Sequence, residues 1–200
     1  MAVTVQEMKS LEDAAEKHGT PKLVLMERAA EGIVAVLERK FDLQDKTILF
    51  VCYHGNNGGD GFAAARIMHE KGYSAKVLFI GEEAKLKAEA RENYVRLRES
   101  EKSAGQIFVD RFIDANIIVD AILGLSASGP LAPALVVAVD RINASSAIKV
   151  SIDIPTGIDP DAKVVHRPSV RSDLIITMHD LKPCLLPYRD KTAVVDIFLH

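Results

Sequence analysis

The sequence predicts an α/β fold in which a doubly wound, mostly parallel sheet carries helices on both faces and forms a single three-layer domain. Short apolar runs rich in β-branched residues alternate along the chain with longer amphipathic stretches, as expected of βαβ units. The strand-like runs are apolar at almost every position, which is typical of parallel strands covered on both faces. The 200 residues contain no internal repeat, low-complexity tract or long linker. We therefore expect one domain over residues 1–200.

The chain opens with a helical segment, about residues 1–40, that we expect to pack on this domain. Thr20 and Pro21 predict an N-cap and a first helical position. Apolar residues then recur at spacings of three and four over residues 22–40, which predicts a helix with one buried face. Residues 47–53 (TILFVCY) are apolar, with many β-branched and aromatic side chains, which predicts a central parallel strand.

The rest of the chain continues the alternation of strands and helices. A glycine-rich loop over residues 55–61 leads into a helix over residues 62–72, and two further helices are predicted over residues 81–100 and 131–143. The other strands are predicted over residues 74–80, 106–110, 116–122, 149–154, 174–178 and 193–198.

The composition is that of a soluble globular protein, with 48% hydrophobic and 26% charged residues. In the predicted helix 81–100, Glu83 and Lys87, and likewise Glu92 and Arg96, stand four residues apart, which indicates a solvent-exposed face. Lys and Arg number 25 against 28 Asp and Glu, and this net charge of −3 gives no attraction to phosphate backbones or anionic lipid. We expect neither nucleic acid nor a membrane as a partner.

The cysteines and the N-terminal residues indicate a cytoplasmic protein. Cys52 and Cys184 form no CxxC pair, which suits a reducing compartment. Residues 1–19 carry scattered charges and lack the continuous apolar core of a secretory signal. The longest apolar runs are far shorter than the ~20 residues that cross a bilayer, so no membrane span is predicted.

Three loops that follow predicted strands are the candidate site, because ligands of open α/β sheets bind beyond the carboxyl ends of the strands. In the first, residues 55–61 (GNNGGDG), glycines let backbone amides approach an anion, and the next helix directs its positive end to the same place. This pattern is neither a Walker A loop nor GxGxxG, and it indicates a phosphate or pyrophosphate site. The alternative is a tight turn built by the asparagines and glycines.

The second and third loops each bring an acid to the end of an apolar strand. Asp120 precedes a loop of small residues over 124–130, and its buried charge requires either a cation or neighbouring backbone amides. The third loop, residues 153–159 (DIPTGID), begins with Asp153 and turns sharply at Pro-Thr-Gly.

Together the three loops offer only oxygen ligands, from Asn57, Asp120, Asp153 and Thr156. Hard cations prefer such ligands, whereas zinc would require Cys or His at ligand spacing, and the six histidines show no such spacing. No GxSxG sequence is present, and Cys52 has no basic neighbour, so we expect no covalent nucleophile.

These motifs closely resemble those of the YjeF N-terminal domain family, the NAD(P)HX epimerases. The matching segments, over about residues 25–198, are LMERAA (25–30), GNNGGDGFAAAR (55–66), VDAILG (119–124), SIDIPTGID (151–159) and the segment 173–183 with Lys182. The chain departs from the family pattern at Arg28 and Ala30, over residues 161–171, and at Lys191 and Thr192. These departures concern outer substrate contacts and the dimer surface.

The resemblance implies a Rossmann-like fold and an isomerase that interconverts the R and S epimers of hydrated NADH or NADPH, a repair of damaged nicotinamide cofactor. It implies a potassium ion bound by Asn57, Asp120 and Thr156. It also implies a homodimer that works with a separate NAD(P)HX dehydratase, since no dehydratase domain is fused to this chain. The substrate-binding residues that it implies are Asn56, Asn57, Gly58, Gly59, Asp60, Gly124, Leu125, Ser126, Ala127, Ser128, Gly129, Pro130 and Asp153.

The implied reaction needs an acid/base group and no nucleophile. The hydrated ring carries a hydroxyl beside its nitrogen, and the carbon inverts when hydroxide leaves and returns from the other face. We predict Asp153 as the catalytic group and Lys182 as a second candidate. Two alternatives remain. One is a non-catalytic nucleotide-binding or scaffold module of the same fold. The other is an NAD-dependent dehydrogenase, which the missing GxGxxG motif disfavours.

Overall fold

A single parallel sheet organises the molecule. The computed structural model describes residues 2–125, 127, 129–160, 165–166 and 168–198. Within these residues seven strands pair in the order β3-β2-β1-β4-β5-β6-β7, and every pairing between neighbours is parallel. The strands are β1 Thr47–Cys52, β2 Ser74–Phe79, β3 Phe108–Val109, β4 Ile117–Ala121, β5 Ile148–Ile152, β6 Leu174–Met178 and β7 Thr192–Val195. The predicted parallel sheet is confirmed, although β3 and β7 are shorter than expected.

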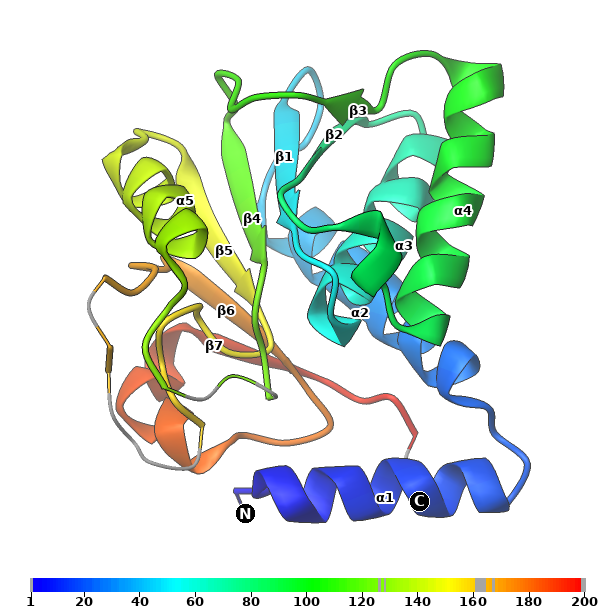
Figure 1. Cartoon of the computed structure of the whole chain (residues 1–200), viewed down its shortest axis with the longest axis vertical. Coiled ribbons are helices and arrows are strands. Elements are labelled where there is room, and N and C mark those ends of the chain that lie inside the picture. Colours follow the sequence, from blue (N-terminus) through cyan, green and yellow to red (C-terminus); the bar gives the residue numbers. More distant parts are fainter. Residues whose placement is uncertain (1, 126, 128, 161–164, 167, 199–200) are drawn as a thin grey trace.

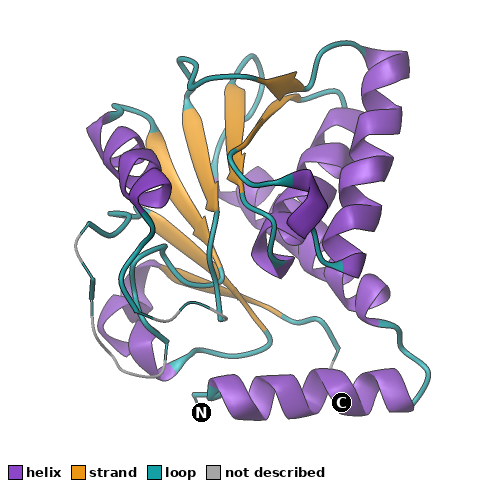
Figure 2. Ribbon diagram, in the orientation of Figure 1, coloured by secondary structure: helices purple, strands orange, loops and turns teal. Residues whose placement is uncertain are grey.

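Helices cover both faces of this sheet, which confirms the predicted three layers (Figures 1 and 2). The helices are α1 Val5–Lys17, α2 Lys22–Lys40, α3 Asn56–Glu70, α4 Ala88–Ala104 and α5 Pro133–Ala144, with short 3₁₀ helices at Glu83–Lys85 and Pro183–Lys191. The helices α2, α3 and α4 lie on one face and α5 lies on the other, whereas α1 lies across one end of the sheet (Figure 1). No helix within the described residues is long and apolar enough to span a bilayer.

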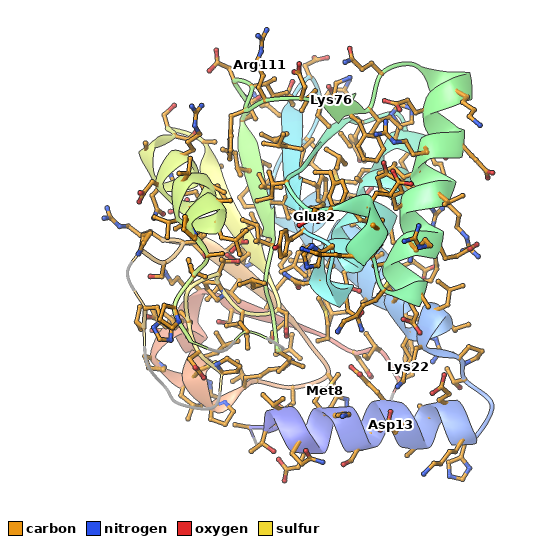
Figure 3. All side chains as sticks on the ribbon, in the orientation of Figure 1. Met8, Asp13, Lys22, Lys76, Glu82 and Arg111 are labelled. Carbon is orange, nitrogen blue, oxygen red and sulfur yellow. The ribbon has the colours of Figure 1, made fainter. Side chains whose placement is uncertain are left out.

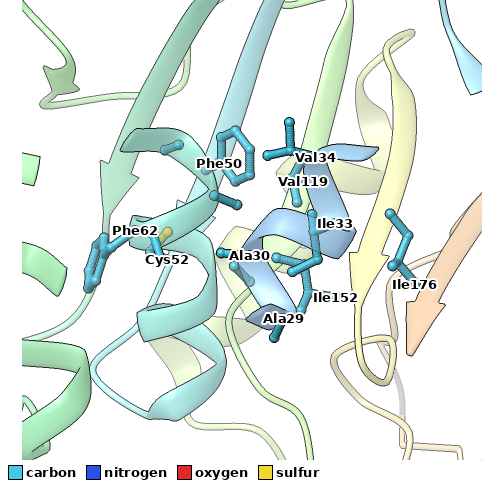
Figure 4. Packing of buried hydrophobic residues seen from close by; sticks show 14 of the residues in the cluster. Ala29, Ala30, Ile33, Val34, Phe50, Cys52, Phe62, Val119, Ile152 and Ile176 are labelled. Carbon is cyan, nitrogen blue, oxygen red and sulfur yellow. The ribbon is translucent and has the colours of Figure 1, made fainter. Parts of the chain in front are cut away.

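The core is divided between the two faces because successive strand residues point to opposite sides. In β1, Phe50 packs with α2 and α3, while Leu49 and Val51 belong to the cluster beneath α5. Figure 4 shows the larger cluster, in which Phe50 and Val119 lie near Ile33 of α2. The continuous apolar runs therefore arise from a sheet that is buried on both faces.

Three local predictions are wrong, each for a local reason. The N-cap of α2 is Pro21, and no side chain caps it, so Thr20 does not have the capping role that we expected. Glu83 and Lys87 do not pair across a helical turn, because Glu83 lies in a 3₁₀ helix and Lys87 is the N-cap of α4. The predicted pair of Glu92 and Arg96 does form, at 2.9 Å.

The third error concerns the glycine-rich segment. Helix α3 already begins at Asn56, with Gly55 as its N-cap, so residues 56–61 are its first turns and not a loop. Glycine is a poor helix former, and composition alone therefore favoured a loop. Close contacts with Tyr53 and with Met26 of α2 require glycine in this helix.

Candidate active site

A cavity of about 170 Å³ lies beyond the carboxyl ends of the central strands. It is bounded by α1, by the start of α2, by the N-terminus of α3 and by the segment 122–125 that follows β4. Asn56, Asn57 and Asp60 of α3 line it, as does Asp153 after β5. The cavity is therefore at the place where an open α/β sheet binds its ligands.

Close packing explains the glycines at the start of α3. A Cβ atom on Gly58 would lie 1.8 Å from the carbonyl oxygen of Tyr53, and one on Gly59 would lie 2.7 Å from the Sδ atom of Met26. Both positions are buried, and neither lines the cavity. The glycines bring the N-terminus of α3 against β1 and α2. This end of the helix, where backbone N–H groups lack helical partners, is suited to an anion.

Asp120 links the loops that follow β4 and β5. Its fully buried carboxylate accepts hydrogen bonds from the Thr156 backbone N–H (2.9 Å), the Thr156 hydroxyl (2.7 Å) and the Ser151 hydroxyl (2.8 Å). Burial raises the pKa of Asp120, and these hydrogen bonds oppose the rise. Of the two alternatives left open for its charge, the structure shows the backbone and hydroxyl donors.

Asn57 joins the start of α3 to the loops that follow β4 and β5. Its Nδ2 donates to the carbonyl oxygen of Leu123 (3.0 Å), and the Leu123 backbone N–H donates to the hydroxyl of Thr156 (3.1 Å). The Oδ1 atom of Asn57 is buried and has no hydrogen-bond partner within the described residues. The start of α3 therefore meets the two loops, and one buried oxygen acceptor is left without a partner at the point of contact.

Asp153 is held on several sides. Its Oδ1 atom lies 3.1 Å from the Nζ of Lys182 and accepts from the hydroxyl of Thr177 (3.2 Å), while its Oδ2 accepts from the backbone N–H of Leu125 (3.0 Å). The residue has a φ of 64°, a left-handed conformation that is uncommon for a side-chain-bearing residue. A Cβ on Gly124 would lie 2.8 Å from Oδ2, so glycine is required there for the loop to approach the carboxylate.

Lys182 lies behind Asp153 and does not line the cavity. Its side chain is fully buried, and its Nζ also donates to the hydroxyl of Thr177 (2.9 Å) and to the carbonyl oxygen of Met178 (2.6 Å). With Asp153, these partners account for its three N–H donors. This arrangement favours a positioning role for Lys182 over direct contact with a substrate.

Substitution of Lys182 by methionine is expected to destabilise the fold by about 3–5 kcal/mol, because it leaves the largely buried Asp153 carboxylate without its cation. Urea denaturation measures this loss. The double variant Lys182→Met/Asp153→Asn should recover part of it, since neither charge then remains. A Lys182→Met protein as stable as the wild type would show that the pair contributes nothing.

Three further acids, Asp60, Glu12 and Glu89, line the cavity, and Glu12 and Glu89 were not predicted from the sequence. Burial raises the pKa of Asp60 well above its ordinary value, with further contributions from Asp153 and Glu12. Glu12 and Met8 reach the cavity from α1. The capping box of Thr4 and Glu7 at the start of α1 is a sequence signal that indicates this helix.

The shifted pKa of Asp60 predicts a pH-dependent stability. The folded state keeps the Asp60 proton to a higher pH than the unfolded chain, whose aspartates titrate near about 3.9. The free energy of unfolding therefore decreases as the pH rises from about 4 through the folded pKa. In urea denaturation, Asp60→Asn should gain stability relative to wild type on going from about pH 4.5 to about pH 7.5. Asp114→Asn, at an exposed position, is the control, and an equal response of both variants would contradict the prediction.

The remaining predicted residues are divided between two cavities. Gly124 and Leu125 line the main cavity, whereas Ala127, Gly129 and Pro130 line a smaller one of about 100 Å³. Ser126 and Ser128 lie outside the described residues.

The described residues contain no cluster of three or more His, Cys, Asp or Glu side chains that could hold a metal ion. Burial raises the pKa of Cys52 well above its ordinary value and that of Cys184 to about 11, so both remain thiols at neutral pH.

Arg28, one of the departures from the family pattern, donates to the carbonyl oxygen of Ile197 (3.3 Å), a residue that lines the cavity.

Comparison with known proteins identifies relatives over most of the chain. It is 36% identical over 190 residues to an NAD(P)H-hydrate epimerase of Weissella koreensis, a match that covers 92% of this chain and 83% of that protein. It is 39% identical over 194 residues to a bifunctional NAD(P)H-hydrate repair enzyme of Pyrobaculum aerophilum, covering 92% of this chain and 38% of that protein. The chain thus spans about two fifths of the length of the bifunctional relatives.

The fold also has a solved counterpart. The crystal structure of the yeast protein ynu0 superposes with a TM-score of 0.81 and 23% identity, over 97% of this chain and 87% of that one. At this identity the likeness shows the fold alone. The family model described as YjeF-related protein N-terminus matches residues 22–184, which include the α3 N-terminus, Asp120, Asp153 and Lys182. This chain therefore belongs to the YjeF-related protein N-terminus family.

Proposed function

We propose that this protein is an NAD(P)H-hydrate epimerase, an isomerase that interconverts the R and S epimers of hydrated NADH or NADPH. The named activity of the Weissella relative, and of a Rhodobacter capsulatus relative that is 33% identical and covered over 89% of its length, supports this proposal. The observation that carries it is the placement of Asp153 and the N-terminus of α3 on one cavity. An anion site beside an acid/base group suits a dinucleotide whose ring must exchange a hydroxyl.

Asp153 acts as the proton-transferring group in this proposal. The ring C–O bond breaks as the hydroxyl takes a proton and leaves as water, and the lone pair of the ring nitrogen forms a C=N bond. Water then adds to the opposite face and gives its proton to a carboxylate. Lys182 and Thr177 hold Asp153 in place for this transfer. The N-terminus of α3, at Asn56 and Asn57, binds the diphosphate.

Asn57, Asp120 and Thr156 are the proposed ligands of a potassium ion. They present oxygen atoms only, and the unpartnered Oδ1 of Asn57 is an acceptor that fits a hard cation. A bound potassium ion would supply positive charge beside the substrate diphosphate. The hydrogen bonds that join these three residues through Leu123 would place their oxygens together.

Potassium is expected to raise the melting temperature of the protein. A ligand that binds only the folded state at about 100 times its Kd stabilises by about 2.7 kcal/mol, which corresponds to several degrees for a chain of this size. The measurement is thermal unfolding in potassium chloride against lithium chloride at equal ionic strength. Asn57→Ala should lose the difference between the salts, whereas Asn116→Ala should keep it. No difference in the wild-type protein would contradict the ion site.

The epimerase activity is tested with the separated epimers. Each epimer of hydrated NADH, and then of hydrated NADPH, is incubated with the protein, and the epimer ratio is followed by chromatography. The expected result is relaxation to the equilibrium ratio far faster than in buffer. Binding without acceleration would favour the alternative, a non-catalytic nucleotide-binding or scaffold module.

The assembly and cellular context are proposed on the same basis. We propose a cytoplasmic homodimer whose product passes to an NAD(P)HX dehydratase. The bifunctional repair enzymes among its relatives support a functional coupling of this kind. Light scattering of the purified protein tests the dimer.

A further inference from the structure

Helix α1 carries a carboxyl group into the cavity that the family motifs do not include. Glu12 lines the cavity together with Met8, which is 2% exposed, one turn before it. Figure 3 shows Met8 on the side of α1 that faces the rest of the molecule. The neighbouring Asp13 pairs with Lys22 at 2.7 Å, whereas Glu12 has no hydrogen-bond or ion-pair partner within the described residues. Its carboxyl group is therefore free to meet a ligand.

The position of Glu12 is fixed from both ends of α1. Before the helix, the backbone N–H of Val3 donates to the carbonyl oxygen of Leu181 (2.7 Å), next to Lys182 in the chain. Towards its C-terminal end, the contact of Asp13 with Lys22 ties α1 to the first residue of α2. The helix is thereby held across the cavity. Glu12 approaches from this covering helix, and Asp153 approaches from the end of the sheet.

The surroundings of the two carboxyl groups differ. Burial raises the pKa of Glu12, and the charge of Asp153 raises it further, while the charges of Lys22 and Lys182 oppose this rise. Asp153 instead lies 3.1 Å from the Lys182 ammonium group and accepts hydrogen bonds from Thr177 and Leu125. Two acids in one site with different surroundings are suited to separate donor and acceptor roles.

We propose that Glu12 is a second proton-transferring residue of this site and serves the face of the substrate ring opposite to Asp153. The proposal rests on the epimerase function proposed above. One carboxyl gives its proton to the departing hydroxyl, which leaves as water while the ring nitrogen forms the C=N bond. Water adds at the other face, and its proton goes to the second carboxylate. The two groups have then exchanged protonation states, and solvent restores them before the next turnover.

Exchange of oxygen with water separates this arrangement from one with a single acid. Each epimer is prepared with oxygen-18 in its hydroxyl, and mass spectrometry follows the loss of the label in the epimer that has not inverted. The wild type should invert both epimers and should exchange the hydroxyl oxygen of both with water. Glu12→Gln should lower the rate of inversion by at least about 10²-fold. It should still exchange the hydroxyl oxygen of the one epimer whose hydroxyl faces Asp153. Asp153→Asn should exchange the hydroxyl oxygen only of the other epimer, whose hydroxyl faces Glu12.

Glu16→Gln is the matched control, because Glu16 is exposed on the same helix and does not line the cavity. It should invert and exchange both epimers as the wild type does. Unchanged inversion by Glu12→Gln, or an equal slowing of exchange for both epimers, would overturn the role of Glu12. A wild-type protein that accelerates neither reaction would instead overturn the proposed function itself.

Discussion

Asparagine at position 153 is expected to lower the kcat of epimerisation by about 10²–10⁴-fold, the range that general acid/base groups usually contribute. The amide keeps the shape of the carboxylate, and its carbonyl can still accept the hydrogen bond from the Leu125 backbone N–H. It cannot transfer a proton at this position. Substrate affinity should therefore change much less than kcat.

Steady-state kinetics with each epimer and a separate binding titration measure the two effects. Asp114→Asn, which neutralises an exposed carboxylate in the segment before β4, should retain wild-type kinetics. Full epimerisation by Asp153→Asn with the ligand still bound would remove Asp153 from the mechanism. A variant that neither binds nor folds is identified by its circular dichroism, and Asp153→Glu then tests the role with the carboxylate retained.

The fold was predictable because its signals are local. A parallel strand buried on both faces needs apolar side chains at successive positions, and β1 from Ile48 to Cys52 and β6 from Leu174 to Ile176 meet this condition. The positions of Asp120 and Asp153 follow from the same logic, because the carboxyl ends of parallel strands share one edge of the sheet. The sequence therefore predicted correctly that Asp120 and Asp153 lie at this edge of the sheet.

The covering helix could not be placed in this way. Nothing near Glu12 in the sequence indicates that it approaches Asp153. That proximity depends on the hydrogen bond between Val3 and Leu181, which are far apart in the chain, and on the ion pair of Asp13 with Lys22. Likewise, the composition around Asp120 could not distinguish a cation from the hydroxyl and amide donors of Thr156, because these enter only when two loops meet.

The glycine-rich segment shows the same limit and gives the sharpest test of the fold. Alanine in place of Gly58 should destabilise the protein by about 3 kcal/mol or more, and lower its melting temperature by roughly 6–12 °C. The added Cβ would meet the backbone oxygen of Tyr53 at 1.8 Å, and backbone cannot rotate away as a side chain can. The φ of Gly58 is not positive, so the expected loss comes from the contact and not from backbone strain.

Gly55→Ala is the matched variant, because a Cβ there meets nothing within 4 Å. It should change stability by less than about 1 kcal/mol, in line with the small effect of this exchange at an N-cap. Helix propensity alone predicts the opposite order, since alanine within α3 would stabilise the helix by about 1 kcal/mol. A Gly58→Ala protein more stable than Gly55→Ala would therefore mean that α3 does not lie against Tyr53. In that case the N-terminus of α3 would lose its position beside Asp153, and the proposed anion site would be lost with it.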